Sequence, residues 1–313
     1  MIKHLTNDLI DREQWDACIN RAVNGYVYAY SWYLDIVCPG WEALVEDDYS
    51  AVFPLPSALK YGIAYCIQPY FTQQLGLFSV APLSSGVVES FIQAIPAKFK
   101  YIDLNFNTLN NIKDERRLVI PMADYELDLI AEYEKIAAAF SSNLSRNLKK
   151  AAKCCLTLVK NVKPDDVVHL FRNNRGQRLS HLGNKQYFLL TRLIYACIYK
   201  GIGEVWGTYD EHNQLCAGVV WLRSNNRIIF LFSGLSQQGR QCGAMPFLID
   251  SMIRQHAGTP VILDFEGSND EDLARFYAGF GSKRVTYHRI IMNRLSVFGQ
   301  IGLRFVRSLR KLR

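Results

Sequence analysis

Residues 261–282, VILDFEGSNDEDLARFYAGFGS, place the carboxylates of Asp264 and Glu266 close to the turn Gly267-Ser268 and to the aromatic pair Phe276-Tyr277. An apolar run leads into Asp264 and Glu266, which alternate along a predicted strand and therefore share one face. Two carboxylates on one face can position an acceptor amine or remove its proton, and Glu266 is nearer the open end of the strand. A structural alternative remains open, in which Asp264 hydrogen-bonds the turn and Glu266 pairs with an arginine.

A short predicted helix carries Phe276 and Tyr277 past these carboxylates. The Tyr277 hydroxyl suits proton donation to a departing thiolate, because phenol and thiol pKa values differ by only about 1.5 units. Alternatively, Tyr277 is an interfacial aromatic residue whose hydroxyl faces water. The stretch therefore predicts either an acyl-transfer site or a packed turn.

Two parts of the chain repeat one order of predicted elements: strand, loop, helix and strand. Both first strands contain Leu-Phe-Ser, both last strands contain an Asp, and Ser79 and Ser233 lie about half the chain apart. We interpret this pattern as a duplication. The first copy has its elements at 75–79, 87–95 and 101–107, and the second has them at 229–234, 245–253 and 261–269, with a loop at 235–244.

Further strands and helices surround the two copies. Residues 41–56 predict a hairpin, and 204–234 predict three antiparallel strands joined by polar turns. Helices are expected around 128–140, 143–153, 165–174 and 185–200. Each half is thus an α/β (α+β) unit with a mixed, mostly antiparallel sheet flanked by helices.

Composition favours a globular protein of two domains. The chain has 313 residues, of which 49% are hydrophobic and 12% aromatic, and no apolar run is long enough to span a membrane. The N-terminus is too charged for a signal peptide, and the eight cysteines form no CxxC pair and no metal-ligand spacing. We expect a cytoplasmic protein with reduced cysteines and no structural metal.

The net charge of +7 resides almost entirely in the last segment. Residues 294–313 contain six basic residues and no acid, so the rest of the chain is nearly neutral and lacks the basic groove of a nucleic-acid-binding protein. The apolar residues of this segment recur at helical steps, which predicts a basic amphipathic helix. It either lies on an anionic membrane surface or packs on the second domain.

The order of elements resembles the GNAT fold of acyl-CoA N-acyltransferases, and its tandem copy resembles the FemABX aminoacyltransferases and their bacterial relatives. Residues 264–281, DFEGS followed by ARFYAGFG, are similar to that family's Asp-Phe-x-Gly-Ser turn and Phe-Lys-x-x-Phe-Gly helix end. The segments 143–159 and 171–178 resemble its basic helices. The resemblance implies a degenerate GNAT-like domain at 1–140, a GNAT-like domain with the donor site at 141–293, and the basic helix at 294–313.

This resemblance implies an acyl-CoA or another activated acyl donor. The chain has Tyr277 where the family has a Lys implicated in aminoacyl transfer, which argues against an aminoacyl-tRNA donor. The sequence around Arg240, Gln241, Gly243 and Ala244 resembles the GNAT phosphate-binding loop, in which small residues at a helix N-terminus hold a pyrophosphate. A Gly-rich turn before a helix is the alternative, since Met245 replaces a small residue. The first copy has no basic residue in this loop, so only the second is expected to bind a donor.

The acceptor is expected between the two halves. Arg172, Arg175 and Arg178 suit an anionic acceptor or form an exposed helix end, and Tyr70 and Gln73 are candidate contacts from the first half. Together with Asp264, Gly267, Ser268 and Phe276, these are the candidate substrate-binding residues, and Tyr277 and Glu266 are the candidate catalytic residues. Two functions remain open. One is an N-acyltransferase with a small or lipid-linked amine acceptor, and the other is a non-catalytic ligand-binding protein on a decayed GNAT scaffold.

Overall fold

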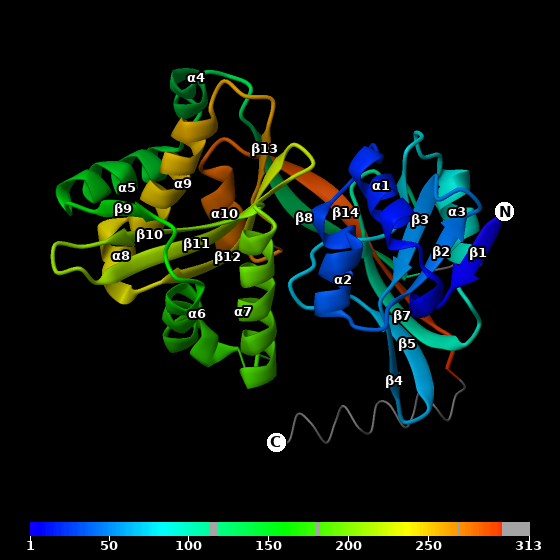
Figure 1. Ribbon diagram of the computed structural model, residues 1–313. Helices are drawn as coiled ribbons and strands as arrows, with labels where there is room; N and C mark the ends of the chain where they lie inside the picture. Colours follow the sequence, from blue (N-terminus) through cyan, green and yellow to red (C-terminus); the bar gives the residue numbers. More distant parts are fainter. Residues whose placement is uncertain (113–117, 180–181, 268, 296–313) are drawn as a thin grey trace. The chain divides into compact units, whose positions relative to one another are not determined.

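A computed structural model describes residues 1–112, 118–179, 182–267 and 269–295 (Figure 1). The chain forms two compact units. Unit 1 consists of Met1–Pro121 and the segment that begins at Tyr287, and unit 2 consists of Met122–Thr286. The boundary expected from the sequence was between residues 140 and 141. The structural division differs because strand β8 (Leu118–Asp128) leads into unit 2 and strand β14 (Lys283–Asn293) leads back to unit 1.

Unit 1 has two groups of strands. The first has the order β1-β2-β3-β6 and is antiparallel throughout, and the predicted hairpin at 41–56 is confirmed as β2 and β3. In the second group, β4 and β5 form a hairpin, β5 runs parallel to β7, and β7 pairs antiparallel with β14. The strands are β1 (Ile2–Leu5), β2 (Glu42–Glu46), β3 (Ala51–Leu55), β4 (Ser57–Lys60), β5 (Ile63–Ile67), β6 (Phe78–Ser79) and β7 (Phe99–Phe106).

Polar side chains cap the N-termini of two helices of unit 1. Asp11 caps α1 (Arg12–Arg21) by accepting backbone hydrogen bonds from Glu13 and Gln14, and Ser84 caps α3 (Ser85–Gln93) through Val87. Helix α2 (Ser31–Val37) is short. The apolar face of α3 packs into a core that contains Phe53, Phe91, Phe99, Phe106 and Ile290. Each such buried side chain contributes about 1.5–3 kcal/mol of hydrophobic stabilisation.

Unit 2 has one sheet with the order β8-β13-β12-β11-β10-β9. Strands β12 and β13 are parallel, and the other neighbours are antiparallel, which confirms the three antiparallel strands predicted over 204–234. The bounds are β9 (Thr157–Lys160), β10 (Gly203–Tyr209), β11 (Leu215–Ser224), β12 (Arg227–Leu235) and β13 (Ile262–Asp264). The two units thus share one feature, a parallel pair (β5 with β7, β12 with β13) followed by an antiparallel strand.

Helices cover both faces of this sheet. Helices α6 and α7 pack on one face and α9 on the other, with α5 against α9 (Figure 1). The helices are α4 (Tyr133–Ala137), α5 (Ser142–Lys153), α6 (Pro164–Asn173), α7 (Asn184–Tyr199), α8 (Gln237–Cys242), α9 (Ala244–His256) and α10 (Glu271–Ala278). The core contains Trp206, Trp221, Phe230, Phe265 and Phe280.

Two expectations from the sequence need correction. Residues 235–244 were expected to be a loop, but Ser236 caps the short helix α8 by accepting a hydrogen bond from the Gly239 N–H. The alignment of Ser79 with Ser233 does not hold in the strand pairing. Ser79 lies in β6, which pairs antiparallel with β3, whereas Ser233 lies in β12, the parallel neighbour of β13.

Candidate functional site

The parallel strands β12 and β13 are paired over only a short stretch. Their register joins Arg227–Ile229 to Ile262–Asp264, while β12 continues to Leu235 on β11 alone, with a bulge opposite Val220 and Trp221. A parallel pair that parts in this way leaves one side of β12 without a neighbouring strand. This opening is the feature of unit 2 that makes room for a ligand.

A pocket of about 420 Å³ lies at this opening. Its wall is largely apolar, with two arginines, and comes from five α-helices, β12 and the short 3-10 helix Arg175–Arg178. The lining residues are Asn147, Phe171, Arg175, Phe230, Ser233, Leu235, Gly239, Arg240, Gly243, Met245, Pro246, Leu273, Phe276 and Tyr277. An apolar pocket with a few convergent polar groups is typical of a small-molecule or cofactor site.

Tyr277 is positioned in this pocket by α10. Asp270 caps that helix through the backbone N–H groups of Asp272 and Leu273. The Tyr277 ring is buried and stacks on Phe265 at 5.0 Å between centroids. Its hydroxyl has no hydrogen-bond partner among the residues that the structure describes.

Burial raises the pKa of Tyr277, and the negative charge of Glu266 raises it further. The hydroxyl therefore keeps its proton at neutral pH. In this state it can donate a hydrogen bond or a proton to a group bound in the pocket, and it cannot serve as a base.

The junction between α8 and α9 forms another part of the wall. Gly243 has φ +71°, and a Cβ there would lie 2.6 Å from the backbone oxygen of Asn147, so this position requires glycine. Ala244 and Met245 place backbone N–H groups of the first turn of α9 at this junction, whereas Pro246 has no N–H to offer. Of the residues predicted to bind the donor, Arg240 and Gly243 line the pocket. Gln241 is exposed and Ala244 is fully buried, and neither lines it.

The turn after β13 is fixed by two buried aspartates. Asp264 Oδ1 accepts the Glu266 N–H at 2.8 Å, just before the Gly-Ser turn, whereas the Gly267 N–H of that turn donates to Asp124 Oδ1 at 2.7 Å. Glu266 has φ +49°, and Gly267 approaches Asp124 so closely that a Cβ would lie 2.2 Å from its Cα. Ser268, a predicted substrate contact, lies outside the described residues.

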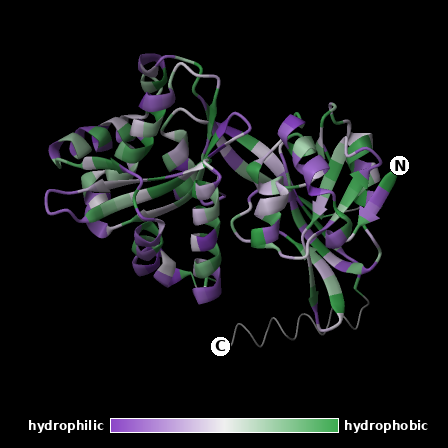
Figure 2. Cartoon of the chain, viewed as in Figure 1, coloured by the Kyte–Doolittle hydropathy of each residue, from purple (hydrophilic) through white to green (hydrophobic). Residues whose placement is uncertain are grey.

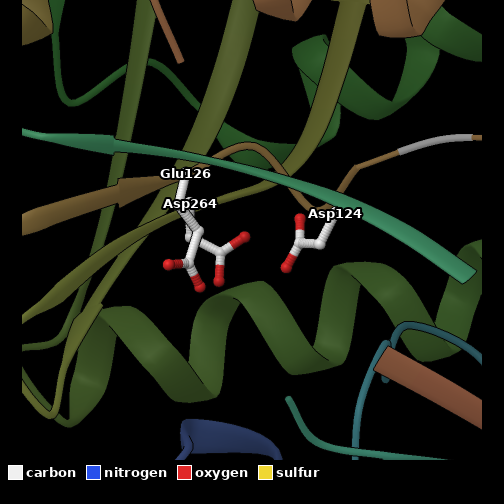
Figure 3. A group of neighbouring side chains, drawn as sticks. All are labelled: Asp124, Glu126 and Asp264. Carbon is white, nitrogen blue, oxygen red and sulfur yellow. The ribbon is translucent and has the colours of Figure 1, made fainter. Parts of the chain in front are cut away.

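Asp124, Glu126 and Asp264 form a carboxylate cluster (Figure 3). Each offers an oxygen within 4.8 Å of the others, and Figure 3 shows all three side chains on one side of the strands. The cause is the register, because Asp264 lies opposite Glu126 on β8 and Asp124 is two residues away on the same face. Burial and the charge of Asp264 raise the pKa of Asp124 well above its usual range.

Arg227 supplies positive charge to this cluster. Its Nη1 lies 2.6 Å from Glu126 Oε1 and 3.4 Å from Asp264 Oδ2. Three carboxylates can ligate a hard cation, but here the guanidinium already compensates two of them. Sequence reasoning did not find Asp124, Glu126 or Arg227. The alternation Asp124-Tyr-Glu126 was the available signal, since it places two acids on one face of a strand.

The remaining predicted contacts are dispersed. Arg175 lines the pocket, whereas Arg172 donates to Asn184 Oδ1 at 2.7 Å and lies over the Tyr187 ring, and Arg178 is exposed. Tyr70 and Gln73 belong to unit 1 and stay predictions. The segment 296–313, most of the predicted basic helix, lies outside the described residues. Among the helices that the structure describes, none is long and apolar enough to cross a membrane.

The fold is that of the GNAT-like, FemABX-related proteins. No protein-family model and no curated protein matches the sequence. Among solved structures, FemX is similar with a TM-score of 0.65 at 12% identity, over 93% of this chain and 98% of that chain.

Two further structures share the fold. The C-terminal domain of a predicted lysylphosphatidylglycerol synthetase from Agrobacterium fabrum has a TM-score of 0.55 at 10% identity, over 96% of both chains. L-PGS from Bacillus licheniformis has a TM-score of 0.53 at 10% identity, over 97% of both chains. At these identities the similarity establishes the fold.

Proposed function

We propose that the protein is an acyltransferase whose activated donor binds in the pocket of unit 2. The observation that carries the proposal is the hydroxyl of the buried residue Tyr277, which has no partner among the described residues and faces a pocket opened by the parting of β12 and β13. Arg240 and the N-terminus of α9 lie in the same wall. Positive charge and free backbone N–H groups there suit the phosphates of a donor such as an acyl-CoA.

The transfer assigns a role to Tyr277. An acceptor amine attacks the acyl carbon, the bond between that carbon and the leaving sulfur or oxygen breaks, and the leaving atom takes the Tyr277 proton. The attacking nitrogen loses one proton, for which Glu266 is the candidate base: its charge acts on Tyr277, although it is not among the residues that line the pocket. Burial keeps Tyr277 protonated but raises its pKa and so makes it a weaker acid, which suits protonation of the alkoxide from an aminoacyl ester better than of the thiolate from an acyl thioester.

The acceptor class is drawn from the similar structures. The name lysylphosphatidylglycerol synthetase specifies an amino-acid group joined to a phospholipid, and FemX bears the name of the aminoacyltransferase family that the sequence resembles. We therefore propose an aminoacyl or acyl transfer to a lipid-linked or small amine acceptor. Arg175, at the pocket wall, is the candidate contact for an anionic part of that acceptor. A cytoplasmic protein that lies on the membrane surface would suit such an acceptor.

One observation favours the second candidate, a ligand-binding protein without catalysis. Met245 lines the pocket one position after Ala244, where the GNAT loop has a small residue. A large apolar side chain beside the N-terminus of α9 leaves less space for a pyrophosphate. In this candidate the pocket holds an apolar ligand and Tyr277 only donates a hydrogen bond to it.

A ligand panel distinguishes the two candidates. The melting temperature is measured with acyl-CoAs, acyl carrier protein thioesters and aminoacyl-tRNA, since a ligand of the folded state raises it. Each stabilising ligand is then incubated with amine acceptors, and transfer is followed by mass spectrometry. Binding with transfer supports the acyltransferase. Binding without any transfer supports the ligand-binding protein, and an absence of binding across the panel contradicts the acyltransferase.

A further inference from the structure

The β4–β5 hairpin of unit 1 exposes large apolar side chains at its tip. Leu59 is 72% exposed and Tyr61 is 79% exposed, although both residue types are usually covered in a folded protein. From Ser57 to Ile67 the only charged residue is Lys60, whose ammonium lies 5.4 Å from the centre of the Tyr61 ring. Figure 2 shows apolar stretches along this hairpin.

The turn at the tip is not optimised for stability. Lys60 pairs with Ile63, so Tyr61 and Gly62 form a two-residue loop in which both φ angles are positive, +53° and +74°. Such loops favour Asn-Gly, and a tyrosine with positive φ costs roughly 1 kcal/mol relative to an allowed conformation. An aromatic side chain in a strained and exposed position needs a reason outside the folding of this unit.

Cations lie at the same end of the unit 1 sheet. Ala64, next to the tip, pairs with Phe99 at the start of β7, and Asn293 at the end of β14 pairs with Tyr101. The exposed residues Lys100 and Arg294 therefore lie near the tip end of the hairpin, and the Arg294 backbone N–H donates to the Lys100 carbonyl at 2.8 Å. Lys98 precedes β7 directly, and its Nζ lies 2.7 Å from Oε2 of Glu42, a mostly buried acid.

The chain leaves the described structure at this end. Beyond Leu295 the sequence has five basic residues, Arg304, Arg307, Arg310, Lys311 and Arg313, and no acid. An apolar tip with a tyrosine and a lysine, surrounded by cations, has the composition of surfaces that lie at the boundary of anionic lipid. Tyrosine is favoured at that boundary because its ring is apolar and its hydroxyl reaches water.

We propose that the tip of the β4–β5 hairpin inserts Leu59 and Tyr61 into the interface of an anionic lipid bilayer. Lys60, Lys100 and Arg294 contact the headgroups. This surface lies in unit 1 and does not depend on the pocket of unit 2 or on its chemistry. Lipid binding by the hairpin therefore stands or fails separately from the acyltransferase proposal.

Vesicle flotation of the full-length protein tests the proposal. Vesicles of phosphatidylglycerol and phosphatidylcholine should carry the protein upward at low salt, and vesicles of phosphatidylcholine alone should carry much less. The double variant Leu59→Asn with Tyr61→Asn should reduce the partition at least about tenfold. Leu109→Asn is the matched control, because Leu109 is an exposed leucine of unit 1 (53%) away from the tip, and it should change the partition less than about twofold.

The single variant Tyr61→Asn separates lipid binding from folding. Asparagine is favoured at a positive φ, so the melting temperature should stay the same or rise while the vesicle partition falls. Wild-type protein that stays in the lipid-free fraction would overturn the proposal, and so would variants that float as well as the wild type. If the double variant instead converts a dimer to a monomer in lipid-free solution and vesicle binding is absent, a second copy covers the tip and the lipid proposal is wrong.

Discussion

The carboxylate of Asp124 accepts a hydrogen bond from the backbone N–H of Gly267 at 2.7 Å, although the two residues are 143 positions apart. Asp124 lies on β8, the strand with which unit 2 begins at Met122. Gly267 lies in the turn between β13 and α10. The bond therefore ties the strand that opens unit 2 to the turn that carries Glu266 and precedes Tyr277. Substitutions here should act on the site by moving this turn.

A glycine pair tests the geometry of the α8–α9 junction. Gly243 and Gly201 both have φ +71°, but a Cβ at Gly243 would meet the Asn147 oxygen at 2.6 Å, whereas the Gly201 Cβ would have no atom within 4 Å. Both alanine variants should lose about 1 kcal/mol from the positive φ. Gly243→Ala should lose clearly more stability in urea unfolding and should weaken donor binding. Equal losses in the two variants would show that the contact with Asn147 does not shape the pocket.

Arg227 should be essential for the stability of unit 2. It is mostly buried and compensates the charges of Glu126 and Asp264. Arg227→Met leaves these carboxylates without their cation and should lower the free energy of unfolding by about 3 kcal/mol or more. Arg275→Met removes an exposed pair with Asp272 and should cost about 0.5 kcal/mol or less. Chemical denaturation measures both. A small loss for Arg227→Met would mean that the cluster is compensated in another way.

Asp124 should make the protein less stable as pH rises. Its pKa is raised in the folded state, so folded protein binds more protons than unfolded protein at pH values above about 4. Unfolding then releases a proton, and the free energy of unfolding falls as pH rises from about 4 through the folded-state pKa. Asp124→Asn keeps an oxygen acceptor for Gly267 and should flatten this fall. Glu271→Gln, at the exposed start of α10, is the control and should leave the slope unchanged.

Tyr277→Phe should separate chemistry from binding. If Tyr277 protonates the leaving group, turnover should fall tenfold or more while donor affinity changes little. Because burial keeps the hydroxyl neutral, the wild-type rate should show no loss from Tyr277 ionisation between pH 6 and about 10. Tyr125→Phe is the control, since its ring lies 6.3 Å from that of Tyr277 in the same core. Equal turnover in wild type and Tyr277→Phe would leave Tyr277 as a packing residue.

Local patterns were sufficient for most of the fold. The alternation in 204–234 and the apolar helical run at 245–253 correspond to β10–β12 and α9, because these elements are specified by periodic burial of their own residues. Helix α8 was missed, since its cap at Ser236 lies among glycines and polar residues that also suit a loop. The discontinuous unit 1 was missed because it depends on where β14 pairs, which is a long-range property.

The site was only partly predictable for the same reason. Tyr277, Arg240 and Gly243 come from motifs that are continuous in sequence, and the structure brings them to one pocket. Asn147 and Ser233 reach this pocket from distant elements, and the local patterns that contain them marked a helix and a strand but not a pocket wall. Arg227 joins Glu126 and Asp264 across three strands. Only the register of β8, β13 and β12 places these charges together.

The central claim is that the pocket of unit 2 holds the activated donor. Ser233→Trp places a large side chain in the pocket wall, and Ser224→Trp, at the far end of the β11–β12 hairpin, is the control. The dissociation constant of the strongest donor ligand is measured by titration calorimetry for wild type and both variants, after matched unfolding midpoints are established. We expect at least about tenfold weaker binding for Ser233→Trp and unchanged binding for Ser224→Trp. A donor that binds wild type and Ser233→Trp with equal affinity would contradict the assignment of this pocket.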